Sequence, residues 1–151
     1  MMAGRKRVMV IGPTGSGKTT LINALNHVED PDPVRKTQNI IYKDKTIDVP
    51  GAYLECPWMY KHIIAAAQGA SHVLIVVDQS RCDDIYSPGF AKVFRCPVLG
   101  VITKTDLKKE NEEVANRLLN KAGVEEPYFR VSTLTDEGVQ ELRDYLFEAS
   151  D

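Results

Sequence analysis

Apolar residues along the chain form short continuous runs that alternate with longer stretches of helical periodicity. Short runs bounded by turn residues predict buried strands, whereas apolar positions that repeat every three to four residues predict amphipathic helices. Two short segments on either side of Asp44 are predicted to form a hairpin: Asn39–Tyr42 and Lys45–Val49. The other predicted strands are Arg7–Ile11, Val73–Asp78, Val98–Thr103 and Tyr128–Val131. The predicted helices are Thr19–Asn26, Trp58–Gln68, Glu110–Ala122 and Val139–Ala149.

Strands that are apolar throughout and separated by helices indicate a mainly parallel sheet with helices on both faces. We therefore predict an α/β fold of three layers, with residues 1–151 forming a single domain, because no repeat or long linker divides the sequence. Residues 79–93 predict a loop with at most a short helix. Apolar side chains at helical spacing, Trp58 and Ile63 among them, are expected in the core.

Composition and charge narrow the range of partners. Hydrophobic residues make up 43% of the chain and charged residues 26%, which is typical of a globular protein. A net charge of −2 provides no basic surplus for nucleic acid or an anionic membrane. The sequence contains no apolar run long enough to cross a bilayer and no pattern typical of a signal peptide, so a cytoplasmic location is expected.

The segment Gly12-Pro-Thr-Gly-Ser-Gly-Lys-Thr19 matches the pattern G-x-x-x-x-G-K-[ST] of a phosphate-binding loop. It lies between a predicted strand and a predicted helix, where backbone N–H groups gather at the positive end of the helix. Lys18 is expected to reach the β- and γ-phosphates as the catalytic side chain, and the Thr19 hydroxyl is placed to bind Mg²⁺. The expected phosphate-binding residues of this loop are Gly12, Gly15, Ser16, Gly17, Lys18, Thr19 and Thr20.

A second motif, Asp48-Val-Pro-Gly51, follows the hairpin. In nucleotide-dependent switches such an aspartate holds Mg²⁺ through water, and the glycine N–H contacts the γ-phosphate. Asp48 is therefore an expected metal ligand, and Gly51 is an expected phosphate contact.

A third motif, Thr103-Lys-Thr-Asp106, ends a strand at the sheet edge where ligands bind in such folds. The Asp106 carboxylate can accept hydrogen bonds from the N1–H and the 2-amino group of guanine, whereas adenine offers no such pair of donors. Lys104 can lie along the base, and a backbone N–H after the last strand can meet the guanine oxygen. The expected base-binding residues are Thr103, Lys104, Asp106, Ser132 and Thr133.

These elements, in this order, resemble the Ras-like P-loop GTPases over essentially the whole chain. The resemblance implies a third Mg²⁺ ligand at Thr37, which lies 18 residues after Thr19. A narrower similarity, to the EutP/PduV family, rests on three segments: Arg35-Lys-Thr-Gln38, Asp48-Val-Pro-Gly-Ala-Tyr53 and Trp58-Met-Tyr60. That family belongs to ethanolamine- and propanediol-utilisation operons, so the resemblance implies association with a bacterial microcompartment and its shell proteins.

One departure from the Ras-like pattern affects the expected rate of GTP hydrolysis. Ras-like enzymes carry a water-orienting glutamine after the second-motif glycine, and here that residue is Ala52. We therefore expect a slow GTPase or switch that uses Mg²⁺ and GTP or GDP. Two alternatives stay open: an ATP-dependent acetate kinase, an activity ascribed to part of the family, and a noncatalytic nucleotide-binding scaffold that docks to shell proteins.

Overall fold

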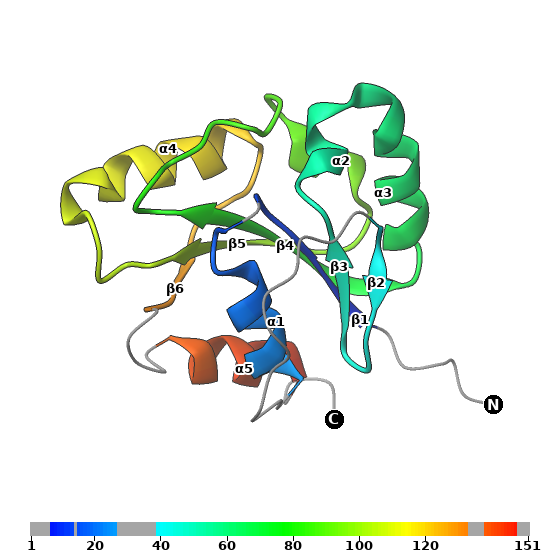
Figure 1. The fold of residues 1–151 in the computed structure, drawn as a ribbon, viewed down its shortest axis with the longest axis horizontal. Helices are drawn as coiled ribbons and strands as arrows, with labels where there is room; N and C mark the ends of the chain where they lie inside the picture. The colour runs from blue at the N-terminus through cyan, green and yellow to red at the C-terminus, as the bar shows by residue number, and fades with distance from the viewer. Residues whose placement is uncertain (1–6, 14, 27–38, 133–137, 148–151) are drawn as a thin grey trace.

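The computed structural model describes residues 7–13, 15–26, 39–132 and 138–147. Within these residues, strands form one sheet of order β2-β3-β1-β4-β5-β6, in which all neighbours are parallel except the antiparallel pair β2 and β3 (Figure 1). The predicted hairpin and the mainly parallel sheet are thus confirmed. The strands are β1 (Arg7–Ile11), β2 (Ile41–Tyr42), β3 (Thr46–Val49), β4 (Ala70–Asp78), β5 (Val98–Thr103) and β6 (Phe129–Arg130).

Helices cover both faces of this sheet, as Figure 1 shows. Helices α1 and α5 lie on one face, and α2, α3 and α4 lie on the other. The three-layer α/β fold is therefore confirmed. The α-helices are α1 (Lys18–Leu25), α2 (Ala52–Glu55), α3 (Tyr60–Ala67), α4 (Glu112–Lys121) and α5 (Val139–Phe147), and 3₁₀ turns span Pro57–Met59, Phe90–Val93 and Lys109–Asn111.

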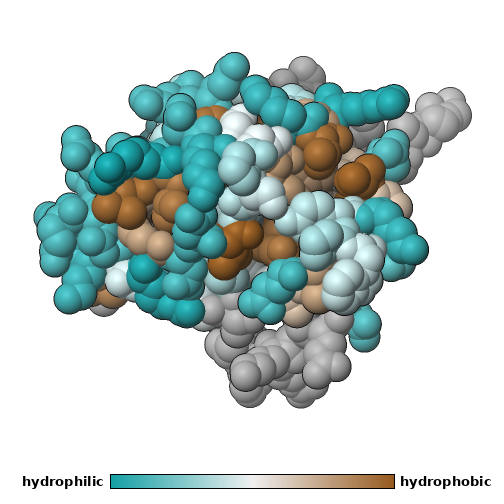
Figure 2. Space-filling view, turned by 90° about the horizontal axis from the view of Figure 1, so that it is seen from above, coloured by the Kyte–Doolittle hydropathy of each residue, from teal (hydrophilic) through white to brown (hydrophobic). Residues whose placement is uncertain are grey.

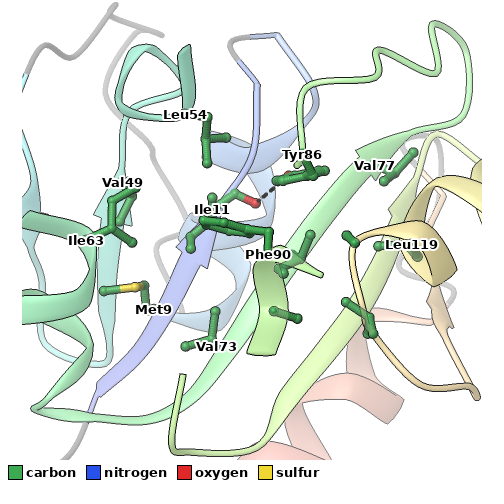
Figure 3. Close-up of a cluster of buried hydrophobic side chains, with 14 of the residues drawn as sticks. Met9, Ile11, Val49, Leu54, Ile63, Val73, Val77, Tyr86, Phe90 and Leu119 are labelled. Atoms are coloured by element: carbon green, nitrogen blue, oxygen red, sulfur yellow. Dashed lines mark hydrogen bonds between the residues drawn. The ribbon is translucent and has the colours of Figure 1, made fainter. Parts of the chain in front are cut away.

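The core consists of two apolar layers, one on each side of the sheet. Strand β1 contributes to both, because successive side chains of a strand point to opposite faces. Val8 and Val10 pack in the layer beneath α1 and α5, whereas Met9 and Ile11 pack in the layer beneath α3 and α4. Figure 3 shows the second of these layers. A strand that is buried on both faces explains the continuous apolar run in the sequence.

Tyr86, in the loop between β4 and β5, joins the ends of two strands. Its hydroxyl donates to the carbonyl oxygen of Val76 at 2.6 Å and lies 3.2 Å from the carbonyl oxygen of Ile11, the contact drawn in Figure 3. Burial raises the pKa of the Tyr86 phenol, so it stays a donor. Residues 79–93 otherwise form the predicted loop with a short 3₁₀ turn, and this loop supports the start of the segment that follows β1.

The prediction for Trp58 is wrong. Its side chain is 70% exposed, although Ile63 is fully buried as expected. Trp58 lies in the 3₁₀ turn that begins at Pro57, and α3 begins only at Tyr60. The tighter turn gives its side chains a different angular spacing from an α-helix, so Trp58 does not extend the buried stripe of α3.

The surface over α2, α3 and α4 is mainly hydrophilic, with small separate apolar patches (Figure 2). No helix among the described residues is long and apolar enough to span a membrane.

Candidate functional site

The phosphate-loop motif connects β1 to α1 at the carboxyl edge of the sheet. Gly12 lies close to β4, where a Cβ atom in its place would be 2.9 Å from Cβ of Val76. Gly17 caps α1 with φ +87°, a conformation that other residues rarely adopt. Two glycines of the motif are thus required by the backbone path. Thr14 lies outside the described residues.

Lys18 and Asp48, from different motifs, form an ion pair. The Nζ atom of Lys18 lies 2.7 Å from Oδ1 of Asp48 and donates to the carbonyl oxygen of Val49 at 2.7 Å. The two side chains are only 8% and 10% exposed. They meet because β3 pairs with β1, and the register places Asp48 beside Val10. Both ends of this pair are groups that the sequence assigns to phosphate and metal binding.

The described residues offer oxygen ligands for Mg²⁺ at this place. Asp48 supplies a carboxylate, and Thr19, a half-buried residue next to Lys18 in the first turn of α1, supplies a hydroxyl. Mg²⁺ prefers oxygen ligands and usually retains several waters beside one or two carboxylates and substrate phosphates. The donor set therefore fits Mg²⁺ held jointly with phosphate oxygens. The described residues contain no cluster of three or more His, Cys, Asp or Glu side chains, and Thr37 lies outside them.

The remaining predicted phosphate-binding residues lie within a few positions of Lys18 or Asp48 in the sequence. Ser16 is fully buried, Gly15 is exposed, and Thr20 is exposed in the first turn of α1. Gly51 lies at the N-terminus of α2 in a right-handed helical conformation. Ala52, the residue after it, opens that short helix and carries no polar group.

The third motif is bonded directly to the phosphate loop. Lys104, with φ +57°, donates from Nζ to the carbonyl oxygen of Gly15 at 2.7 Å and lies 3.0 Å from Oδ2 of the buried Asp78. The Thr103 hydroxyl donates to the carbonyl oxygen of Ser16 and lies 3.3 Å from the carbonyl oxygen of Val77. Both side chains hold the phosphate loop against the end of β4.

Asp106 lies next to the segment that follows β6. Its Oδ1 atom accepts a hydrogen bond from the Ser132 hydroxyl at 3.0 Å. The Thr105 backbone N–H donates to the carbonyl oxygen of Val131 at 3.2 Å, which joins the two segments. Two predicted base-binding residues, far apart in sequence, are therefore brought together. Thr133 lies outside the described residues.

Sequence reasoning missed the polar groups that hold the Asp106 segment in place. Gln79 is 1% exposed, and its Nε2 donates to the carbonyl oxygens of Leu107 at 2.9 Å and Thr105 at 3.3 Å. The side chain of Asn111 donates in turn to the carbonyl oxygen of Gln79 at 3.0 Å. The only signal in the sequence was a polar pair, Asp78 and Gln79, at the end of a buried strand.

A family model described as "Ethanolamine utilisation - propanediol utilisation" matches residues 5–148. The chain belongs to this PduV-EutP family. The resemblance of the sequence motifs to the family is thereby confirmed.

Relatives match over most of their length. A propanediol utilization protein PduV of Citrobacter freundii is 34% identical over 138 residues, covering 91% of this chain and 90% of that protein. A protein of Escherichia coli (strain K12) named probable acetate kinase EutP is 33% identical over 145 residues, covering 93% and 89%.

Solved structures share the fold. A probable GTP-binding protein engB superposes with a TM-score of 0.64 at 21% identity, covering 94% of this chain and 97% of that one. The elongation factor SelB of Methanococcus maripaludis, in complex with the GTP analogue GppNHp, superposes with a TM-score of 0.65 at 21% identity, covering 99% of this chain and 35% of SelB. These likenesses establish the P-loop α/β fold for the chain.

Proposed function

We propose that this member of the PduV-EutP family binds guanine nucleotides with Mg²⁺ and acts as a slow GTPase or a nucleotide-dependent switch. The observation that carries the proposal is the direct bonding of the Thr103–Asp106 segment to the phosphate loop, through Lys104 Nζ and the Gly15 carbonyl. This contact supports the proposal, because it holds the segment that ends at Asp106 and the phosphate-loop motif together at one edge of one sheet, as the binding of a nucleoside phosphate requires.

Each motif has a distinct task in this proposal. The backbone N–H groups of the phosphate loop and the α1 N-terminus bind phosphate oxygens. Lys18 binds the terminal phosphates, and for this it leaves Asp48. Thr19 and Asp48 hold Mg²⁺, which neutralises phosphate charge when bound. Asp106, oriented by Ser132, accepts hydrogen bonds from the two donors on the guanine edge.

Slow hydrolysis follows from Ala52. A methyl group cannot orient an attacking water, so Lys18 and backbone donors supply most of the transition-state stabilisation in this proposal. Slow turnover suits a switch whose signal lasts as long as the triphosphate remains bound. Membership in the PduV-EutP family supports a task in an ethanolamine- or propanediol-type microcompartment, with shell proteins or enclosed enzymes as partners.

Acetate kinase activity is the competing function, because the Escherichia coli relative carries that name. The fold shared with GTP-binding proteins does not support it. Asp106 also argues against ATP, since adenine presents no pair of donors to a carboxylate at that edge. A scaffold that binds nucleotide without turnover remains the second alternative.

Calorimetry with GTP, GDP, ATP and ADP in Mg²⁺ tests the proposal. We expect a guanine preference of about a hundredfold, about 2.7 kcal/mol. Asp106→Asn should abolish most of that preference, because an amide donor then faces guanine donors, and it should favour xanthine nucleotides, whose C2 carbonyl accepts from that amide. Asp84→Asn, at an exposed ion pair with Lys121, is the matched control and should bind GDP like the wild type.

Calorimetry, together with assays of GTP hydrolysis and of acetyl phosphate formation, can overturn the proposal. If ATP bound as tightly as GTP or more tightly, the proposal that Asp106 selects guanine would be wrong. ATP-dependent formation of acetyl phosphate from acetate would establish the kinase instead. Guanine-specific binding with no measurable hydrolysis would favour the switch or scaffold over the GTPase.

A further inference from the structure

Arg81 lies beside the phosphate loop, although it belongs to none of the motifs found in the sequence. Its Nη1 atom is 3.3 Å from the position that a Cβ atom of Gly15 would occupy. Gly15 has no side chain, so the guanidinium from the turn after β4 lies in the space next to the loop. The turn is anchored by the Arg81 backbone N–H, which donates to the carbonyl oxygen of Asp78 at 3.2 Å.

Two cations therefore flank Gly15, and each has a carboxylate partner. Lys104 Nζ contacts the Gly15 carbonyl and Asp78, which is 1% exposed. Arg81 Nη2 lies 2.7 Å from Oδ2 of Asp83. The difference is in exposure, because the side chain of Arg81 is 51% exposed and that of Lys104 is 22% exposed. Lys104 is thus held by two groups of the protein and is mostly buried, whereas about half of the Arg81 side chain is exposed to solvent.

We propose that Arg81 binds the phosphate groups of the nucleotide and slows its release. This inference rests on the proposed function and adds a binding residue to the same site. A phosphate held by the N–H groups of this loop lies within hydrogen-bond distance of the backbone around Gly15. The guanidinium beside Gly15 is then within reach of the same phosphate oxygens, and its planar fork of donors matches phosphate geometry.

In this arrangement, Asp83 restricts the conformation of the Arg81 side chain. A flexible arginine loses side-chain entropy when it is fixed, and a partner carboxylate lowers that cost by restricting it before the nucleotide binds. Asp83 also competes with phosphate for the guanidinium, but a phosphate with more negative charge is the stronger partner.

The experiment compares release of fluorescently labelled GDP from the full chain and from Arg81→Ala, Arg81→Lys and Asp83→Asn variants. Arg95→Ala, at an exposed arginine near the start of β5, is the matched control. We expect Arg81→Ala to release GDP about tenfold faster, Arg81→Lys to lie between, and Arg95→Ala to match the wild type. The difference should narrow at high salt, because exposed charges are screened.

Two further readouts separate a phosphate contact from a structural effect. Guanosine, which carries no phosphate, should bind wild type and Arg81→Ala equally. The melting temperature without nucleotide should be the same for both, since the side chain is half exposed. Equal GDP release from Arg81→Ala and wild type, or an equal loss of guanosine binding, would overturn the inference and leave Arg81 as a surface ion pair.

Failure of the proposed function has a different signature. If the wild type prefers ADP to GDP, the guanine assignment fails, but the Arg81 variants then show the same effect on labelled ADP because the contact is with phosphate. If the wild type binds no nucleoside phosphate, both proposals fail.

Discussion

The two sides of the candidate site are organised in different ways. The phosphate side consists of the Gly12–Thr19 loop and Asp48. Here the charged groups of two motifs are bonded to each other, because Lys18 pairs with Asp48 in a nearly buried place. The base side consists of the Thr103–Asp106 segment and Ser132. Here Asp106 and the backbone around it are held by residues outside the Thr103–Asp106 motif. Gln79 fixes the backbone on both sides of Asp106, and Ser132 donates to the carboxylate itself.

In the proposed function, this difference separates the residues that contribute binding free energy from those that set selectivity for the base. In this proposal a phosphate displaces Asp48 from Lys18, so the gain in binding free energy on that side is reduced by the cost of breaking a buried ion pair. Asp106 accepts a hydrogen bond from the Ser132 hydroxyl, and Gln79 holds the backbone on both sides of it, so its position is set before a base arrives. A preorganised carboxylate discriminates between bases at small entropic cost.

The largest expected effect on stability comes from breaking the ion pair between Lys18 and Asp48 on the phosphate side. Lys18→Met leaves Asp48 nearly buried without its cation, and we expect a loss of about 3–5 kcal/mol in the free energy of unfolding, measured by urea denaturation without nucleotide. Adding Asp48→Asn to the same chain should recover much of that loss, because the unpaired charge is then removed.

Lys121→Met provides the control for this prediction. Lys121 pairs with Asp84 at an exposed place, where an ion pair contributes about 0–1 kcal/mol. If Lys18→Met cost no more than Lys121→Met, the pair would not be a barrier to phosphate binding, and the contrast between the two sides would disappear.

A smaller effect is expected on the base side. Gln79→Leu keeps the side-chain size but removes both hydrogen bonds to the backbone around Asp106, so we expect about tenfold weaker GDP binding by calorimetry. The loss should fall on guanine more than on adenine nucleotides, because the phosphate loop is unchanged. Gln68→Leu, at an exposed position after α3, should leave GDP binding intact. An equal loss for GDP and ADP would show that Gln79 supports the whole site rather than base selection.

The smallest effect concerns the thiol of Cys82 in the turn after β4. Burial, then the charges of Asp78 and Asp83, raise the pKa of this thiol, so it stays protonated to higher pH than an ordinary cysteine. In a Cys56→Ser, Cys96→Ser background, alkylation by iodoacetamide should be slow at pH 8 and rise with pH only toward the raised pKa.

Asp83→Asn sharpens this measurement. Removing one of the two carboxylates should lower the pKa of the thiol and speed alkylation at pH 8 by about twofold. A rate equal to that of a free thiol in the starting variant would mean that the turn opens readily, and the base side would then not be preorganised.

Much of the fold and of the phosphate side followed from the sequence. Arg7–Ile11 and Val98–Thr103 are strands with the predicted bounds, because buried parallel strands leave an unbroken apolar run. The phosphate loop was recognisable because its backbone path depends on residues that are contiguous, from Gly12 to Thr19. The short helix α2 left no periodic signal, since four residues make barely one turn.

The chain thus determined its strands, its hairpin and its motifs through local preference and spacing. Only the tertiary structure decided which motifs meet. The order of strands places β1 between β3 and β4, which brings Asp48 to Lys18 from one side and Arg81 to Gly15 from the other. Lys104 contacts the Gly15 carbonyl across 89 positions of sequence. Such contacts depend on how strands pair and where each ends, and no local pattern of residues encodes them.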